Sequence, residues 1–272
     1  MGACVGRWTA EYLHERTTDK VLAAGVHVCP YRTVDLAGHR LPNSKKNFHF
    51  CEMTFVDFIR RCNPDKFQHL QPLPPVVEEG ERLYLRSVAA GQDAAKRASH
   101  IHETFPELAE DLTLPAGIVY PPARYHSSVL RVTGSKVVTL WPPVEDQNLY
   151  TQGSSSRVES ISNPDLALHP RFFETWQSRL EGELKPGDAV YIPPLWFHHV
   201  RMPSFSVAVN VFWCGSSPDL YNPKDLYGNK DLPVLDQALA LAARAGASLS
   251  KIPQPFRSFY ARRLMRALDE YN

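Results

Sequence analysis

One stretch of the chain carries the residues with the clearest potential for chemistry, and it reads KPGDAVYIPPLWFHHV from Lys185 to Val200. Gly187 permits a tight reversal, and Asp188 can bond back to the backbone of the turn. A short strand and a double proline then lead to His198 on a returning segment. A neutral imidazole inside a β-barrel suits a divalent metal. We therefore predict that His198 is a metal ligand, and the alternative is an ordinary core or surface histidine.

The region around this stretch has the pattern of a small β-barrel or sandwich. Short apolar segments separated by Gly, Pro, Asn and Asp run from Ser127 to Trp213, which is typical of such folds. One or two helical turns are expected at residues 170–177. The segments expected as strands are SSVLRV, KVVTLW, RVESI, RLEGEL, DAVYIP and SVAVNVFW.

The preceding part of the chain mixes helices and strands. Phe55, Phe58 and Ile59 fall at helical spacing, so Thr54 is expected to cap a helix that ends at Cys62. The other expected elements are a helix at 8–13, a strand at 25–31, a loop leading into a strand over 42–55, a strand at 81–88, a helix at 94–105 and a proline-interrupted connection at 112–123.

The end of the chain is expected to be helical. Residues 233–247 are rich in Ala and Leu, and apolar residues recur at helical spacing from Phe256 to Tyr271. Basic residues surround this second stripe, and a smaller basic pair lies near the N-terminus. They either contact RNA phosphates or form a solvated surface. The basic residues concerned are Arg257, Arg262, Arg263, Arg266, Lys45 and Lys46.

The composition is that of an ordinary globular protein. Of 272 residues, 43% are hydrophobic and 22% are charged, and the formal net charge of +1 gives no global argument for nucleic acid or membrane binding. Five cysteines without a CxxC pair do not indicate disulfides or structural zinc. We see no secretory signal and no run long enough to span a membrane, so the expected location is intracellular, in the cytoplasm or nucleus.

Several motifs distributed along the chain resemble one enzyme family. They are GRWTAEYL, SKKNFHF, LYLRS, VTGSKVV, ISNPDLA, GDAVYIPPLWFHHV, VAVNVFW, LYGNKD and FYARR. The chain resembles the JmjC-type oxygenases that depend on 2-oxoglutarate and Fe(II), and especially those that hydroxylate the wybutosine precursor base in phenylalanine tRNA. The resemblance implies an α+β, mainly β fold with a double-stranded β-helix core of the JmjC/cupin-like jelly-roll type. It divides the chain into N-terminal α/β elements (1–80), the core (81–213) and a C-terminal helical region (214–272).

The same resemblance implies roles for individual residues. His198 matches the third iron ligand of the family, whereas His199 is an additional histidine that points elsewhere. Lys136 matches the lysine that pairs with the far carboxylate of 2-oxoglutarate, and a cation inside a barrel needs such a partner. Without the resemblance, Lys136 would be taken as an exposed lysine on a hairpin. A homodimer through the C-terminal helices is also implied.

Two further residues are candidates for cosubstrate binding. Tyr84 matches a tyrosine whose hydroxyl helps to bind the same carboxylate, and the alternative is a half-buried strand tyrosine. Asn210 lies between apolar residues of an expected inner strand. A buried amide there needs partners, so Asn210 either faces the cosubstrate or ties two strands together.

The other two iron ligands are missing from the sequence. A facial triad needs two histidines and one carboxylate, and the family supplies the first two as His-x-Asp or His-x-Glu shortly before VTGSK. None of the eleven histidines has Asp or Glu two residues later. In this chain Leu130 and Arg131 are followed at once by VTGSK. Compared with the family, we infer that about two strands are missing between Leu130 and Val132. We expect poor or no turnover by the chain as written.

Three hypotheses therefore stay open. The first is a tRNA-modifying oxygenase whose ligand pair was lost in splicing or in the gene model. The second is a non-catalytic RNA-binding or dimerisation protein on the same scaffold. The third is a JmjC protein hydroxylase, which LYGNKD and FYARR argue against.

Overall fold

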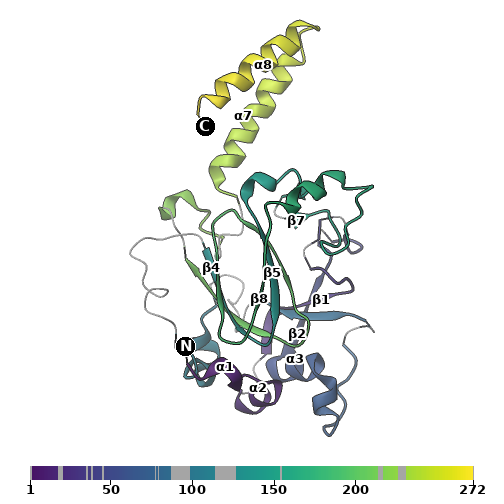
Figure 1. Cartoon of the computed structure of the whole chain (residues 1–272), viewed down its shortest axis with the longest axis vertical. Coiled ribbons are helices and arrows are strands. Elements are labelled where there is room, and N and C mark those ends of the chain that lie inside the picture. Colours follow the sequence, from purple (N-terminus) through teal and green to yellow (C-terminus); the bar gives the residue numbers. More distant parts are fainter. Residues whose placement is uncertain are drawn as a thin grey trace. The chain divides into compact units, whose positions relative to one another are not determined.

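The structure is a computed structural model, and it falls into two compact units, Met1–Ser216 and Ser217–Asn272 (Figure 1). Each unit is described by itself. The described residues are 2–17, 21–34, 36–37, 39–44, 46–76, 78, 80–86, 99–113, 127–153, 155–213, 217–225 and 231–271.

The first unit begins with a three-stranded antiparallel sheet in the order β2-β1-β3. One strand from each of three separate regions contributes to it. These strands are β1 (Val21–Cys29), β2 (His49–Thr54) and β3 (Arg82–Leu85). The helices of this part are α1 (Cys4–Arg7), α2 (Ala10–Arg16), α3 (Phe55–Cys62), the 3-10 helix η1 (Pro64–Phe67), α4 (Ile101–Thr104) and α5 (Pro106–Ala109).

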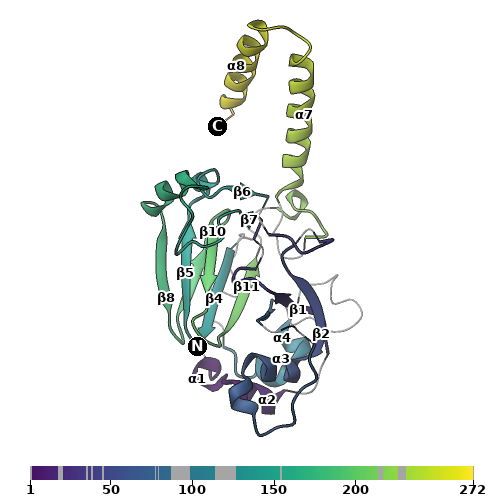
Figure 2. The same cartoon turned by 90° about the vertical axis from the view of Figure 1, so that its right-hand side faces the viewer.

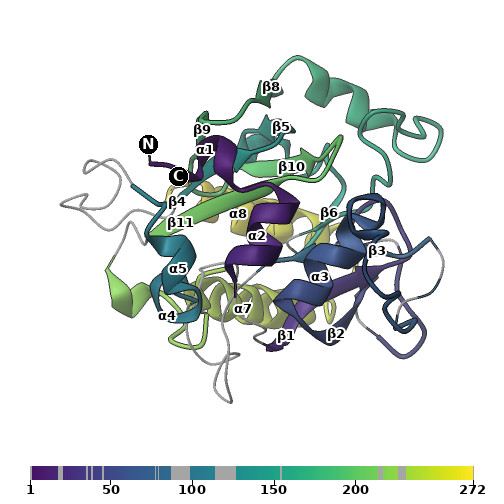
Figure 3. The ribbon, with the colours of Figure 1, turned by 90° about the horizontal axis from the view of Figure 1, so that it is seen from below.

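Helices α2 and α3 pack beside each other against one face of this sheet (Figure 3). The hydroxyl of Thr54 accepts a hydrogen bond from the Asp57 backbone N–H at 3.1 Å, so the expected cap and the end of α3 at Cys62 are confirmed. Val26 from β1 and Ile59 from α3 are almost completely buried in the shared core. This core covers the face of the sheet that carries Val26.

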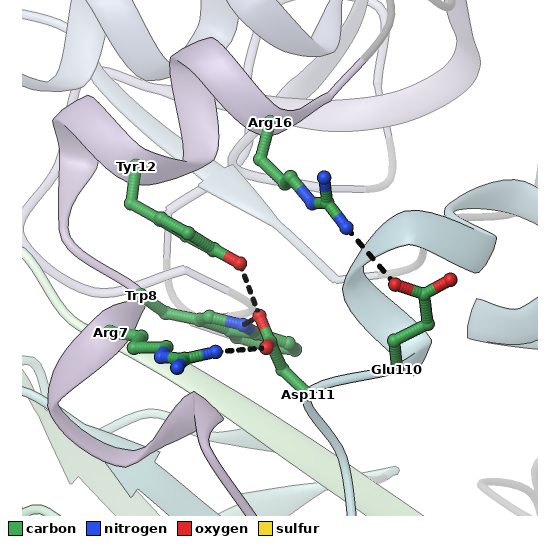
Figure 4. Close-up of polar contacts among 6 residues, drawn as sticks. All are labelled: Arg7, Trp8, Tyr12, Arg16, Glu110 and Asp111. Carbon is green, nitrogen blue, oxygen red and sulfur yellow. Dashed lines mark hydrogen bonds and ion pairs between the residues drawn. The ribbon is translucent and has the colours of Figure 1, made fainter.

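A buried carboxylate fastens the N-terminal helices to the segment after α5 (Figure 4). Asp111 accepts hydrogen bonds from the Tyr12 hydroxyl at 2.7 Å and the Trp8 indole at 3.1 Å, and it pairs with Arg7 at 3.3 Å. Burial acts to raise the pKa of Asp111, but these donors together outweigh burial and hold the pKa below its ordinary value. Arg16 and Glu110 add an exposed ion pair at 3.0 Å.

The rest of the unit is a sandwich of two three-stranded antiparallel sheets, in the orders β11-β4-β9 and β10-β5-β8 (Figure 2). A jelly roll has eight strands, so the six strands described here are two fewer. They are β4 (Ser127–Thr133), β5 (Lys136–Trp141), β8 (Leu180–Leu184), β9 (Ala189–Ile192), β10 (Phe197–Arg201) and β11 (Val207–Trp213).

Short connecting elements complete the sandwich. The expected helical turns at 170–177 are present as the 3-10 helix η4 (Pro170–Trp176). Between β5 and η4 lie the 3-10 helix η3 (Pro143–Glu145) and the two-residue strands β6 (Thr151–Gln152) and β7 (Ser155–Ser156). Phe172 of η4 is buried in a separate cluster with Trp141 at the end of β5.

Two tight turns set the directions of the sandwich strands. Gly134, between β4 and β5, has φ of +91°, and a Cβ there would lie 2.8 Å from the Phe205 carbonyl oxygen, so only glycine fits. Gly187 also has a positive φ, and a carboxylate oxygen of Asp188 accepts a hydrogen bond from the Lys185 backbone N–H at 2.8 Å. The predicted KPGD turn is thereby confirmed.

Two expected elements are wrong. A helix over 94–105 cannot be continuous because His100 has an extended backbone, and the described helix α4 begins at Ile101. Residues 94–98 lie outside the described part of the chain, as does almost all of the expected 112–123 connection. The segment RVESI at 157–161 forms bends instead of a strand. The carbonyl of Glu159 in this segment accepts a hydrogen bond from the Thr33 hydroxyl at 3.5 Å.

The second unit contains the 3-10 helix η5 (Pro218–Leu220) and two α-helices in contact with each other, α7 (Pro233–Leu249) and α8 (Phe256–Asp269). Both helices expected from the sequence are thus present. Neither has a buried residue. Across the described part of the chain, no helix combines the length and apolar character needed to cross a membrane.

Candidate active site

Strand register places Lys136 and His198 on the inner face of the β10-β5-β8 sheet. Val138 and Leu140 of β5 pack into the core between the two sheets, and Lys136 shares their face because side chains alternate along a strand. His198 lies directly opposite Leu140 in the antiparallel pairing, so its side chain points to the same side. His199 consequently lies on the outer face, as expected.

Asn210 projects from the opposite sheet toward the same interior. Its neighbour Ala208 packs into the intersheet core, whereas Val207 and Val209 pack on the other side against the N-terminal core. Alternation therefore directs Asn210 inward. The expectation that its amide is buried is nevertheless wrong, because Asn210 is exposed. Among the described strands, β11 pairs only with β4, and an edge strand leaves its side chains open to water.

Lys136 is a buried cation. Its exposed fraction is 7%, and no hydrogen bond or ion pair joins it to another described residue. Desolvation lowers the pKa of its amine from 10.5 to about 8. Burial excludes the exposed hairpin lysine as an interpretation. An anionic group that enters the sandwich would restore the charge and provide the missing partner.

His198 is held in the form that can bind a metal. Water reaches part of the His198 side chain, which is exposed. Many protein atoms nevertheless surround the ring, and the resulting desolvation lowers the pKa of the imidazole. A hydrogen bond with the Trp196 backbone opposes this shift, and the positive charge of Arg86 adds to it. A neutral imidazole results at physiological pH, which is the ligand form of histidine.

Tyr84 lies in the N-terminal sheet. It pairs with His27 across β3 and β1, and the ring centroids are 5.6 Å apart. Arg86 follows just after β3, and its charge acts on His198. The Tyr84 end of this sheet is thereby linked to the inner face of the sandwich. The rings beside Tyr84 were not predicted as part of a site, although the alternating Phe48-His49-Phe50 in SKKNFHF was a signal for them.

The residues present do not fit iron(II). A 2-His-1-carboxylate triad needs two ligands besides His198. No group of three His, Cys, Asp or Glu side chains within the described ranges is arranged to hold a metal ion. His199 points away, His102 lies on α4, and His126 falls outside the described residues. The residues present do suit a carboxylate, because Lys136 offers it a desolvated positive charge.

The basic candidates fall in three different settings. Arg262, Arg263 and Arg266 are exposed on α8. Arg257 instead donates to the carbonyls of Ser250 and Ile252, both at 3.0 Å, and so joins the end of α7 to α8. Lys46 is exposed, with its amine 5.9 Å from the Phe48 ring centroid, and Lys45 lies outside the described residues.

Comparison with known proteins agrees with this fold. Residues 124–218 match the family model of the cupin-like domain, and cupins are double-sheet jelly rolls. The chain is 35% identical to the tRNA wybutosine-synthesizing protein 5 of Danio rerio over 286 residues, covering 97% of this chain and 82% of the relative. It is 32% identical to the Homo sapiens protein of the same name over 291 residues, with 99% and 86% covered.

A fungal relative aligns with only part of its own length. The tRNA wybutosine-synthesizing protein 4 of Neurospora crassa is 30% identical over 303 residues, covering 99% of this chain and 22% of the relative.

The alignments are also longer than the chain itself. The human alignment spans 291 positions and the chain has 272 residues, so at least 291 − 272 = 19 positions have no residue here. Their total number equals about two strands of five to six residues with their turns. The resemblance and the α+β jelly-roll fold expected from the sequence are confirmed. The chain belongs to the tRNA wybutosine-synthesizing protein 5 family, and its sandwich is a cupin-like domain.

Proposed function

We propose that this chain serves tRNA modification in wybutosine biosynthesis, as a 2-oxoglutarate-dependent hydroxylase scaffold that keeps its cosubstrate-binding half and has lost its iron-binding half. The observation that carries the proposal is Lys136, a buried cation on the inner face of the sandwich with no partner among the described residues. The names of the relatives supply the pathway.

In this proposal the far carboxylate of 2-oxoglutarate pairs with the Lys136 amine. A charge-assisted bond in a desolvated site is strong, and it offsets the cost of burying the cation. The Tyr84 hydroxyl and the Asn210 amide are additional donors. When bound, iron(II) would supply the oxygen chemistry of the family, but His198 by itself does not hold it.

Cosubstrate binding can be tested without catalysis. Isothermal titration with 2-oxoglutarate is expected to give binding to the wild-type chain and none to Lys136→Met, which keeps the side-chain length and removes the charge. Lys224→Met, at an exposed position, is the matched control. Equal binding by Lys136→Met would overturn the assignment of this residue.

Activity can be tested by restoring the missing positions. The segment of the Danio rerio relative that aligns with the gap is inserted between Leu130 and Val132. The restored chain should hydroxylate undermodified phenylalanine tRNA in the presence of iron(II) and 2-oxoglutarate, and the original chain should not.

The restored chain carrying His198→Ala serves as the inactive control. Turnover by the original chain would refute the proposal that this chain has lost its iron-binding residues. Failure of the restored chain, under conditions in which the Danio rerio protein is active, would count against the tRNA assignment. Transcripts that encode His-x-Asp at this junction would identify a splicing or gene-model loss.

A second candidate function is a non-catalytic RNA-binding and dimerisation protein, and the misfit to iron favours it. We propose that α7 and α8 form a homodimer contact and that Arg262, Arg263 and Arg266 contact tRNA phosphates. Exposed apolar side chains on both helices support self-association, because large exposed apolar patches mark interaction sites. They include Leu239, Leu241, Phe256, Phe259, Leu264 and Leu268.

Light scattering after size exclusion tests the dimer. Leu264→Glu should shift the chain toward monomer, whereas Gln237→Glu adds the same charge at an exposed polar position of α7 and should leave the mass unchanged. A monomeric wild-type chain would exclude the dimer. If the restored chain is inactive but the original chain binds tRNA as a dimer, the non-catalytic function is supported.

A further inference from the structure

A row of aromatic rings crosses the β2-β1-β3 sheet. In the strand pairing, His27 lies directly opposite Phe50 on one side and Tyr84 on the other. The ring centroid of His27 is 4.8 Å from Phe50 and 5.6 Å from Tyr84. Phe48 also contacts His27, at 4.5 Å. We call these four residues (Phe48, Phe50, His27 and Tyr84) the aromatic row.

The aromatic row lies on the face of the sheet that the helices do not cover. Val26 and Val28, which alternate with His27, are fully buried, and Val26 packs in the core that contains α2 and α3. His27 and Phe48 are buried, whereas Phe50 is 56% exposed. Buried rings thus hold one phenylalanine in place while much of its surface remains open to water.

Charged residues lie near the aromatic row. The Lys46 amine lies 5.9 Å from the ring centroid of the buried Phe48, and that ring lies 5.5 Å from the exposed Phe50 ring, so a positive charge stands at this end of the row. Glu52, two residues beyond Phe50, places a negative charge at the other end of β2. Past Tyr84, the charge of Arg86 acts on His198. The aromatic row therefore has a cation, Lys46, at its Phe48 end.

We propose that the aromatic row is a stacking platform for an unpaired nucleobase of the RNA substrate, with Phe50 against the base and Lys46 at its phosphate. This inference rests on the proposed tRNA function and adds a binding subsite to it. Aromatic rings stack on any base, and a neighbouring cation pairs with the backbone phosphate. Rings that other rings hold in place lose little conformational freedom on binding.

The test is fluorescence anisotropy with a labelled anticodon stem-loop of phenylalanine tRNA and the full chain. Phe50→Ala should raise the Kd roughly tenfold, since the loss of one stacked base typically costs about that much. Phe173→Ala is the matched control, because Phe173 is 55% exposed and belongs to η4. Phe50→Trp should restore binding, and Phe50→Leu should not, because leucine has no ring to stack.

Salt titration separates the two parts of the platform. Lys46→Ala should reduce the slope of log Kd against log salt by about one, whereas Phe50→Ala should leave the slope unchanged. Ultraviolet crosslinking followed by peptide mapping should join the RNA to the peptide that contains Phe50.

The outcomes distinguish this inference from the function on which it rests. If the wild-type chain does not bind the stem-loop, both the tRNA function and the platform are refuted. If it binds and Phe50→Ala behaves like Phe173→Ala, the platform alone is refuted. Restored affinity in Phe50→Leu would also refute stacking, because apolar contact would then suffice.

Discussion

Two regions of the molecule treat buried polar side chains differently: the N-terminal sheet with its helices, and the β-sandwich. In the first, Asp111 is buried with three donors, and residues such as Leu13, Ile59 and Phe105 are almost completely enclosed. In the sandwich, Lys136 is buried without a partner among the described residues, and the inward-facing His198 and Asn210 are exposed.

Under the proposed function, this difference separates residues that maintain the fold from residues that bind a ligand. Buried polar groups are normally paired, and the unpaired Lys136 is the residue from which we infer that an anion binds. The open interior also fits a sandwich with two strands fewer than a jelly roll. We expect the two regions to respond differently to the same kinds of change.

The largest difference in the free energy of unfolding should appear when one buried isoleucine in each region is replaced by alanine. Ile59→Ala empties a well-packed core and should lower the free energy of unfolding by about 3–4 kcal/mol. Ile192→Ala should cost about 2 kcal/mol, because the described sandwich cluster has only three buried members and its surroundings can collapse. Urea denaturation measures both, and equal costs would mean that the sandwich packs as tightly as the N-terminal core.

Removing the buried carboxylate should come next. Asp111→Ala leaves the Trp8 indole without its acceptor and should cost about 2–3 kcal/mol. Because the folded pKa of Asp111 is lowered, its contribution is complete above the ordinary carboxyl pKa and is lost as the pH falls through the lowered value. The difference between variant and wild type should therefore shrink in acid. Asp65→Ala, at an exposed position, should show neither effect.

The sandwich cation should respond in the opposite direction. Lys136→Met should raise the free energy of unfolding by about 2 kcal/mol at pH 7, because it removes an uncompensated buried charge. Since the folded pKa of Lys136 is about 8 and its ordinary value is 10.5, the unfolded state binds more protons between these values. Wild-type stability should thus rise over this range relative to Lys136→Met.

Thermal melts from pH 7 to pH 10 test this prediction. A destabilised Lys136→Met would show that the amine has a structural partner, and the contrast between the two regions would then fail.

The smallest effect should be at His198. Its side chain is exposed, so His198→Ala should change the free energy of unfolding by no more than about 0.5 kcal/mol. Added iron(II) should shift the melting temperature of neither form, because one imidazole does not make a site. An iron-dependent shift that disappears in His198→Ala would reveal ligands outside the described residues.

Local patterns predicted much of this fold from the sequence. Thr54 and the spacing of Phe55, Phe58 and Ile59 specify α3, and Gly187 with Asp188 specifies the turn before β9, because caps and tight turns depend on residues close in the chain. Five of the six segments expected as strands form strands. The helix expected to run through His100 was wrong because tertiary context overrides weak propensity.

Features that depend on distant pairing could not be predicted in this way. The contacts of Asp111 join residues about a hundred positions apart, and the aromatic row combines residues from three strands whose register no local pattern specifies. The exposure of Asn210 follows from its place on an edge strand. Lys136 was identified through family resemblance and His198 first through the turn, strand and double proline before it, and the structure adds that the two residues share the inner face.

The glycine corner between β4 and β5 has a consequence for what this position tolerates. Because φ of Gly134 is +91° and a Cβ there would lie 2.8 Å from the Phe205 carbonyl oxygen, any other residue would push the corner away from the segment that leads into β11. β4 belongs to one sheet of the sandwich and β5, which carries Lys136, to the other. A single added methyl group at Gly134 would therefore disturb both sheets at once.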